Sequence, residues 1–197
     1  MTIARLIATS LTCTLLWATA VHAQQEVRVR GTIAAFDGKL LTVTARNGNE
    51  VRAELPENVA VSTTRPFSLA DIKPGMVMGV TTVKRTDGTL VAIDVRPIPP
   101  TARQGLSPYD LAPDSVMTNA AVEGLVESAA GQTLTLNYQT GKVTVLVPPG
   151  TPMSQSAPGT RADLKIGEAA VLTARQSEGG LSIVRIQVAK DGVRPTQ

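Results

Sequence analysis

The sequence SLADIKPG at residues 68–75 decides the fold, because the chain contains a second version of it, RADLKIG, at residues 161–167. Both copies read Ala-Asp-aliphatic-Lys-x-Gly, and an apolar run follows each of them. Ser68 can cap a short helical turn, Pro74 ends that turn, and Gly75 lets the chain reverse into the next segment. The motif therefore predicts a helical turn that leads into a strand, twice in one chain.

The similarity between the two halves extends well beyond this motif. Residues 27–51, VRVRGTIAAFDGKLLTVTARNGNEV, align with residues 120–143, AAVEGLVESAAGQTLTLNYQTGKV. Such internal similarity predicts a tandem duplication of a unit of roughly 70 residues. The aligned pairs are Gly31 with Gly124, Gly38 with Gly131, Leu41 with Leu134, Gly48 with Gly141, Pro56 with Pro148, Asp71 with Asp163, Lys73 with Lys165, Gly75 with Gly167 and Gly88 with Gly180.

Each copy has the pattern of β-structure. Apolar residues alternate with others in VRVRGTIAAF (27–36), which is the period of a half-buried strand. The dipeptides Asp37-Gly38, Asn47-Gly48 and Asp87-Gly88 predict tight hairpin turns with positive φ at both central residues. The predicted strands are 27–36, 40–46, 50–55, 59–63, 76–84 and 89–96, and then 121–128, 133–139, 142–147, 168–175 and 182–189.

A five-stranded meander with one helical turn after its third or fourth strand is the plan of an OB-like barrel. The chain is therefore predicted to be all-β, with two tandem small OB-like β-barrels, each closed at one end by the turn that carries Ile72 or Leu164. Five prolines exclude a regular helix or a central strand from the joint, which we expect to lie against the barrels as an ordered strap. The predicted domains are a first barrel repeat at 24–96, a Pro-rich joint at 97–119, a second barrel repeat at 120–190 and a C-terminal tail at 191–197.

The first 23 residues have the features of a cleavable secretory signal peptide. A single basic residue, Arg5, precedes an apolar stretch at 6–21, and Val21-x-Ala23 is a small-residue cleavage signal. Four Thr and one Ser interrupt the apolar stretch, so it falls short of the roughly 20 apolar residues of a membrane span. We therefore expect a periplasmic protein with no membrane span in the mature chain.

Removal of that peptide restricts the chemistry of what remains. Cys13, Trp17 and His22 are the only residues of their types, so residues 24–197 contain none of the three. This composition excludes disulfides, zinc or copper sites built on thiolate or imidazole, and nucleophiles activated by histidine. The remaining side chains carry 18 Lys and Arg against 16 Asp and Glu, and their net charge of +2 supports solubility but does not by itself point to an anionic partner. Export also argues against nucleic acid as a partner.

Two residue pairs are weak candidates for a metal site. Met76 and Met78 stand two residues apart, so on one strand both thioethers would face the same side, as a Cu(I) site requires. Core filling is the commoner use of such methionines. Asp110 and Asp114 form the only close acid pair in the joint, which is too sparse in oxygen ligands for Ca²⁺. We therefore predict no cofactor and no metal.

The order V-x-G-x-(I/V), D-G-x-L-L-T-V, S-L-A-D-I-K-P-G and D-G-T-L-V-A resembles a family of small exported bacterial domains of unknown function. The two-domain form with a joint like SPYDLAPDSVMTNAAVE is similar to proteins often labelled as metal ABC transporter permeases. The resemblance covers nearly all of residues 24–197 and implies an OB-like fold, with no established catalytic residues. The second copy departs from it at Ile166 and at Gly179-Gly180. A permease needs several membrane spans, which the mature chain lacks.

Three function classes remain open. The favoured one is a non-catalytic periplasmic protein that binds or scaffolds an envelope protein or component, since two barrels on a stiff joint suit a bivalent surface. The alternatives are an accessory ligand- or metal-binding protein linked to transport, and an envelope glycan enzyme that uses carboxylates alone. The repeated motif residues are predicted to be architectural, with Asp71 and Lys73 forming at most an exposed ion pair: Asp71, Lys73, Gly75, Asp163, Lys165 and Gly167.

Overall fold

The computed structural model describes residues 26–128 and 131–196, so the predicted signal peptide at 1–23 lies outside the described residues. Within these ranges the chain is all-β, as predicted, and its helical segments are two single 3-10 turns, η1 (Leu69–Asp71) and η2 (Arg161–Asp163). No helix in the described part of the chain is long and apolar enough to cross a membrane. The strands are β1 (Glu26–Phe36), β2 (Leu40–Ala45), β3 (Glu50–Glu54), β4 (Val61–Pro66), β5 (Val77–Lys84), β6 (Leu90–Pro97), β7 (Gly105–Pro108), β8 (Val116–Ser128), β9 (Gly131–Tyr138), β10 (Gly141–Val147), β11 (Ser154–Pro158), β12 (Ala169–Ser177) and β13 (Gly180–Val188).

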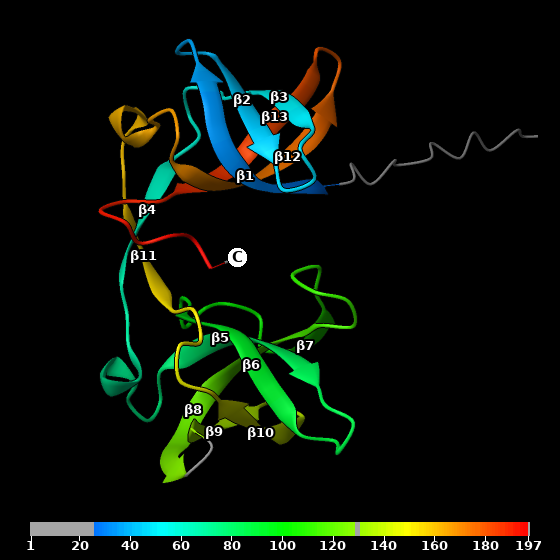
Figure 1. The fold of residues 1–197 in the computed structure, drawn as a ribbon, viewed down its shortest axis with the longest axis vertical. Coiled ribbons are helices and arrows are strands. Elements are labelled where there is room, and N and C mark those ends of the chain that lie inside the picture. The colour runs from blue at the N-terminus through cyan, green and yellow to red at the C-terminus, as the bar shows by residue number, and fades with distance from the viewer. Residues whose placement is uncertain (1–25, 129–130, 197) are drawn as a thin grey trace, which may run out of the picture.

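Each of two closed five-stranded barrels takes strands from both halves of the chain. Barrel A consists of β1, β2 and β3 from the first half with β12 and β13 from the second, and it closes through a parallel pairing of β3 with β13. Barrel B consists of β8, β9 and β10 with β5 and β6, and it closes through the pairing of β5 with β8. Figure 1 shows this exchange directly, because barrel A contains both the blue and cyan strands and the orange and red ones.

Two crossing strands connect the barrels. β4 carries the chain from barrel A to barrel B, and β11 carries it back. They run antiparallel beside each other, with Ser154 opposite Pro66 and Pro158 opposite Ser62. β4 also pairs in parallel with β13, so the ladder of barrel A continues into the crossing. Figure 1 shows the two crossing strands as a pair that spans the gap between the barrels at one side.

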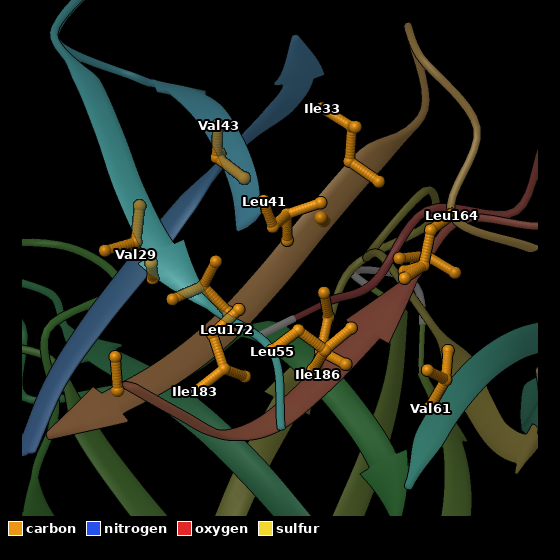
Figure 2. Close-up of a cluster of buried hydrophobic side chains, with 14 residues drawn as sticks. Val29, Ile33, Leu41, Val43, Leu55, Val61, Leu164, Leu172, Ile183 and Ile186 are labelled. Atoms are coloured by element: carbon orange, nitrogen blue, oxygen red, sulfur yellow. The ribbon is translucent and has the colours of Figure 1, made fainter. Parts of the chain in front are cut away.

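The hydrophobic cores confirm that the two halves depend on each other. In the core of barrel A, seven buried residues come from positions 29–61 and seven from positions 164–188. Figure 2 shows that these side chains converge from both sets of strands onto one cluster. In the core of barrel B, six buried residues come from positions 67–95 and six from positions 120–147. In this structure neither half buries its apolar surface alone, because each core is shared between the two halves.

This architecture differs from the expected division, in which residues 24–96 and 120–190 each form their own barrel. The two copies supply equivalent strands, so the apolar pattern alone does not say which copy closes which barrel. The direction of β4 determines which barrel the later strands join. β4 remains extended and pairs with β11, so the chain continues to barrel B and does not fold back onto barrel A. A residue in a strand advances by about 3.3 Å, so the six residues of β4 carry η1 away from barrel A.

The alignment of the first strands also needs correction. Gly75, which follows η1, donates its N–H to Val122, and Gly167, which follows η2, donates its N–H to Ile33. Val122 and Ile33 therefore occupy equivalent positions in the two repeats. The strand irregularities agree, since they lie at Ile33/Ala35 in β1 and at Val122/Gly124 in β8. Gly124 therefore corresponds to Ala35 and not to Gly31. The β8–β9 hairpin is longer than the β1–β2 hairpin, which shifted the sequence alignment by four residues.

The hairpin turns form where they were expected, but with a different backbone. The glycines Gly38, Gly48 and Gly88 have positive φ, whereas the residue before each does not. The preceding side chain accepts backbone N–H groups instead: Asp37 from Leu40 at 2.6 Å and from Lys39 at 2.8 Å. Asn47 and Asp87 each accept from the residue two positions later. These are Asx turns, in which the hydrogen bond to the Asp or Asn side chain stabilises the reversal and only the glycine has positive φ.

The Pro-rich joint is ordered, as predicted. We name residues 98–115 the strap, since β6 ends at Pro97 and β8 begins at Val116. Its strand β7 pairs with the edge of β8, Leu106 opposite Thr118. β7 and β11 were not predicted from the sequence. Beyond β7 the strap contacts barrel A, and that contact forms one side of the candidate site.

Candidate functional site: an arginine-lined cleft between the barrels

The repeated Asp residues cap the two 3-10 turns. The Asp71 carboxylate accepts hydrogen bonds from the backbone N–H of Ser68 at 2.8 Å and from its hydroxyl at 2.7 Å. Asp163 accepts the same pair from Thr160, at 2.8 and 3.1 Å. The Ser68 hydroxyl and backbone hold the pKa of Asp71 below its ordinary value, and the Thr160 backbone N–H does the same for the pKa of Asp163. Each carboxylate is thus part of a capping box.

The repeated Lys residues do not form the expected ion pairs with the repeated Asp residues. Within the described ranges neither Lys73 nor Lys165 forms an ion pair, and Asp163 pairs instead with Lys190 at 3.1 Å. The expected contact between Asp71 and Lys73 is therefore replaced by the cap.

The two glycines join each turn to the other half of the chain. Gly75 and Gly167 adopt positive φ, of 84° and 91°, as a left-handed turn requires. Gly75 donates its N–H to Val122 at 2.8 Å, and Gly167 donates to Ile33 at 2.9 Å. Each turn therefore docks on the first strand of the other repeat, so the motif is a connector between the halves.

The main functional candidate is the inter-barrel cleft, a concave space of about 720 Å³ between barrel A, barrel B and the strap. Barrel A contributes Arg28, Thr173 and Arg185 from three neighbouring strands. Barrel B and the strap contribute Arg96 and Tyr109, and the crossing strands contribute hydroxyl groups. Within the part of the chain that the structure describes, no Asp or Glu lines this space. The further polar lining residues are Ser62, Thr101, Ser107, Asn119, Ser154, Ser156 and Gln187.

A cluster around Tyr109 fixes the strap to barrel A. The guanidinium carbons of Arg28 and Arg30 lie 4.8 and 5.6 Å from the centre of the Tyr109 ring, and that of Arg96 lies 5.9 Å away. Asp110 accepts two hydrogen bonds from Arg30, both at 2.8 Å, and one from Arg28 at 3.0 Å. The hydrogen bonds from Arg30 hold the pKa of Asp110 well below its usual range. Cation–π and bidentate ionic contacts together position the two arginines of β1.

A second ionic group lies deeper, where barrel B faces the cleft. The side chain of Asp94 is completely buried, and it contacts the guanidinium of Arg96 and accepts a hydrogen bond from the Thr81 hydroxyl at 3.1 Å. Burial raises the pKa of Asp94, while Arg96 opposes that rise. Arg96 also contacts the sulfur of Met117 at 3.8 Å. Asp94 therefore supports Arg96 from behind and does not reach the cleft.

The predicted signals for metal do not form a site. Met78 is fully buried in the core of barrel B, and Met76 accepts the backbone N–H of Lys73 on its sulfur at 3.2 Å. Asp110 is bound by arginines, and Asp114 occupies a turn with φ of 55°. Among residues 26–128 and 131–196, no three His, Cys, Asp or Glu side chains come together as metal ligands do.

The cleft arginines were missed by the sequence reading, although a signal for them exists. Arg28 and Arg30 alternate with core residues on one strand, and Asp94 and Arg96 have the same spacing on another. Residues two apart on a strand point to the same side, so the charges of each pair share one face. The joint was expected to lie against the barrels, and its residue Tyr109 is half-buried against these arginines.

Comparison of the chain with protein families, curated proteins and solved structures finds no match. What the protein binds is therefore inferred from its own residues.

Proposed function

We propose that this chain is a non-catalytic exported protein that binds or scaffolds a component of the cell envelope, and that the inter-barrel cleft is its binding surface. The observation that carries the proposal is the cleft itself, which combines about 720 Å³ of space with guanidinium, hydroxyl and amide groups. Clefts of this volume between two domains are the usual place for ligand sites. Export rests on the predicted signal peptide at residues 1–23.

The pairing order supports an OB-like assignment for both barrels. Barrel A orders its strands first, second, third, fifth and fourth, where the fourth and fifth come from the other repeat. Barrel B has the corresponding order. A duplicated OB-like domain whose copies have exchanged their last two strands accounts for both. Membership of the family of small exported bacterial domains that the sequence resembles stays a prediction.

The positions of the carboxylates support a binding role over an enzyme that uses carboxylates alone. Asp71 and Asp163 cap turns, and Asp110 is held by two arginines. Asp94 has the raised pKa that a general acid needs, but it is buried against Arg96 and Thr81. A substrate in the cleft meets arginines and hydroxyls first.

The proposal is tested by capture from an envelope extract of the source organism. The mature chain, immobilised, should retain one component that Ser156→Trp loses, because Ser156 lines the cleft and a tryptophan there fills it. Thr144→Trp is the matched control, since Thr144 lies on β10 at a separate groove. Equal retention by Ser156→Trp and the wild type contradicts the cleft as the binding surface. Conversion of the captured component into a product contradicts a non-catalytic role.

A further inference from the structure

Three polar side chains form one row across the wall of barrel A that faces the cleft. Arg28 on β1 pairs in register with Thr173 on β12, and Thr173 pairs with Arg185 on β13. Neighbouring strands are about 4.8 Å apart, so the two arginine backbones lie roughly 10 Å from each other with the threonine between them. Two guanidiniums at that separation can converge on one bound group.

The charge of this row is only partly compensated. Arg28 shares Asp110 with Arg30, so one carboxylate serves two guanidiniums. Within the described residues Arg185 forms no ion pair, and it is exposed. Across the cleft, Arg96 is matched by Asp94 behind it. The cleft therefore keeps an excess of positive charge on the side that a ligand meets.

We infer that the inter-barrel cleft binds an acidic saccharide, a polyhydroxylated ligand that carries a carboxylate or phosphate group, with that group between Arg28 and Arg185. This inference rests on the proposed function and names the chemistry of its ligand. Planar guanidiniums bind carboxylate and phosphate oxygens in bidentate fashion. The Thr173 hydroxyl between them supplies a further donor.

The rest of the cleft suits the hydroxyl groups of such a ligand. The crossing strands line the cleft with the exposed hydroxyl of Ser156 and with Ser62, whose hydroxyl donates to the Ile186 carbonyl at 2.9 Å and keeps its oxygen as an acceptor. Hydroxyls and amides both donate and accept, as sugar hydroxyls do. Tyr109 faces the arginines, so it orients Arg28 and does not offer a free stacking surface.

The test uses isothermal titration of the full mature chain with three probes: trigalacturonate, glucose 6-phosphate and neutral maltotriose. An anionic probe should bind, more weakly as salt is raised, and maltotriose should not. Arg185→Gln should weaken that binding at least tenfold. Arg175→Gln is the control and should change it less than twofold, because Arg175 pairs with Glu26 at 2.6 Å outside the cleft. The tighter of the two anionic probes identifies whether carboxylate or phosphate is preferred.

The outcomes separate this inference from the proposed function. Binding that is equal for maltotriose and the anions, equal in Arg185→Gln and the wild type, or absent for both anionic probes overturns the acidic saccharide. If Ser156→Trp still abolishes capture from the envelope extract, the cleft remains the binding surface. If Ser156→Trp leaves both capture and probe binding unchanged, both proposals fail. Far-ultraviolet circular dichroism confirms that each variant is folded.

Discussion

Replacing Ile72 with alanine should destabilise β8–β10 of the second repeat more than β1–β3 of its own repeat. Ile72 belongs to the first repeat, yet its side chain is buried in the core of barrel B with Leu134 and Val145. Truncation of a buried Ile to Ala costs 2–5 kcal/mol. Because Ile72 closes one end of the barrel, where the chain can relax, we expect about 2 kcal/mol, which corresponds to a roughly 30-fold larger opening equilibrium constant and so to roughly 30-fold faster exchange of the affected amides.

Hydrogen exchange followed by mass spectrometry measures this effect segment by segment. In Ile72→Ala, amides of β8–β10 should lose protection, while those of β1–β3 should keep most of theirs. Leu164→Ala is the mirror experiment, because Leu164 lies in the core of barrel A. It should expose β1–β3 and spare β8–β10. Loss of protection confined to β1–β3 in Ile72→Ala would refute the exchange of strands.

Three further predictions concern the caps, the strap and pH. Asp71→Asn and Asp163→Asn together should lower the melting temperature by a few degrees, because each carboxylate caps a turn; an unchanged melting curve would contradict this role. Cleavage of the chain at a protease site inserted between positions 100 and 104 should leave two fragments that co-elute in gel filtration, since each barrel needs both; two separate folded fragments would contradict it. The pKa of Asp110 is lowered in the folded state, so its stabilisation is fully present above about pH 4 and is lost progressively as the pH falls from there toward the lowered pKa. Asp110→Asn should thus melt earlier than the wild type at pH 7, and the difference should shrink in acid.

The elements of this fold could largely be predicted from sequence. Alternating apolar residues located the long strands, and the Ser68 motif located η1. These signals are local, because periodicity and capping depend on neighbours in the chain. Strand partners are not local. β5 and β12 both place apolar residues at equivalent core positions, Met78 and Val80 in β5 and Ala170 and Leu172 in β12, so this pattern does not say which of the two strands β1 pairs with.

The candidate site was harder to predict for the same reason. Arg28 and Arg185 belong to different repeats and come together only because β1 and β13 flank β12. Asp110 was noted as one of an acid pair, but its partners lie 80 and 82 residues away. The site thus depends on the exchange of strands, which a linear reading does not reveal.

An engineered disulfide tests the exchange of strands most directly. Residues 24–197 contain no cysteine, so a designed pair is free of competition. Thr32 on β1 lies opposite Ala169 on β12, and opposed residues of antiparallel strands are about 4.5–5.5 Å apart, within disulfide range. If each repeat formed its own barrel, the partner of Thr32 would be the equivalent residue of β5, Val77, which here lies in barrel B opposite Ala121.

The measurement is the disulfide content of two double variants after mild oxidation, by mass spectrometry and non-reducing gel. Thr32→Cys with Ala169→Cys should form an intramolecular disulfide in nearly all monomers, and Thr32→Cys with Val77→Cys should form none. Folding is checked by circular dichroism of the reduced proteins. A disulfide between positions 32 and 77, with free thiols at 32 and 169, would contradict the account.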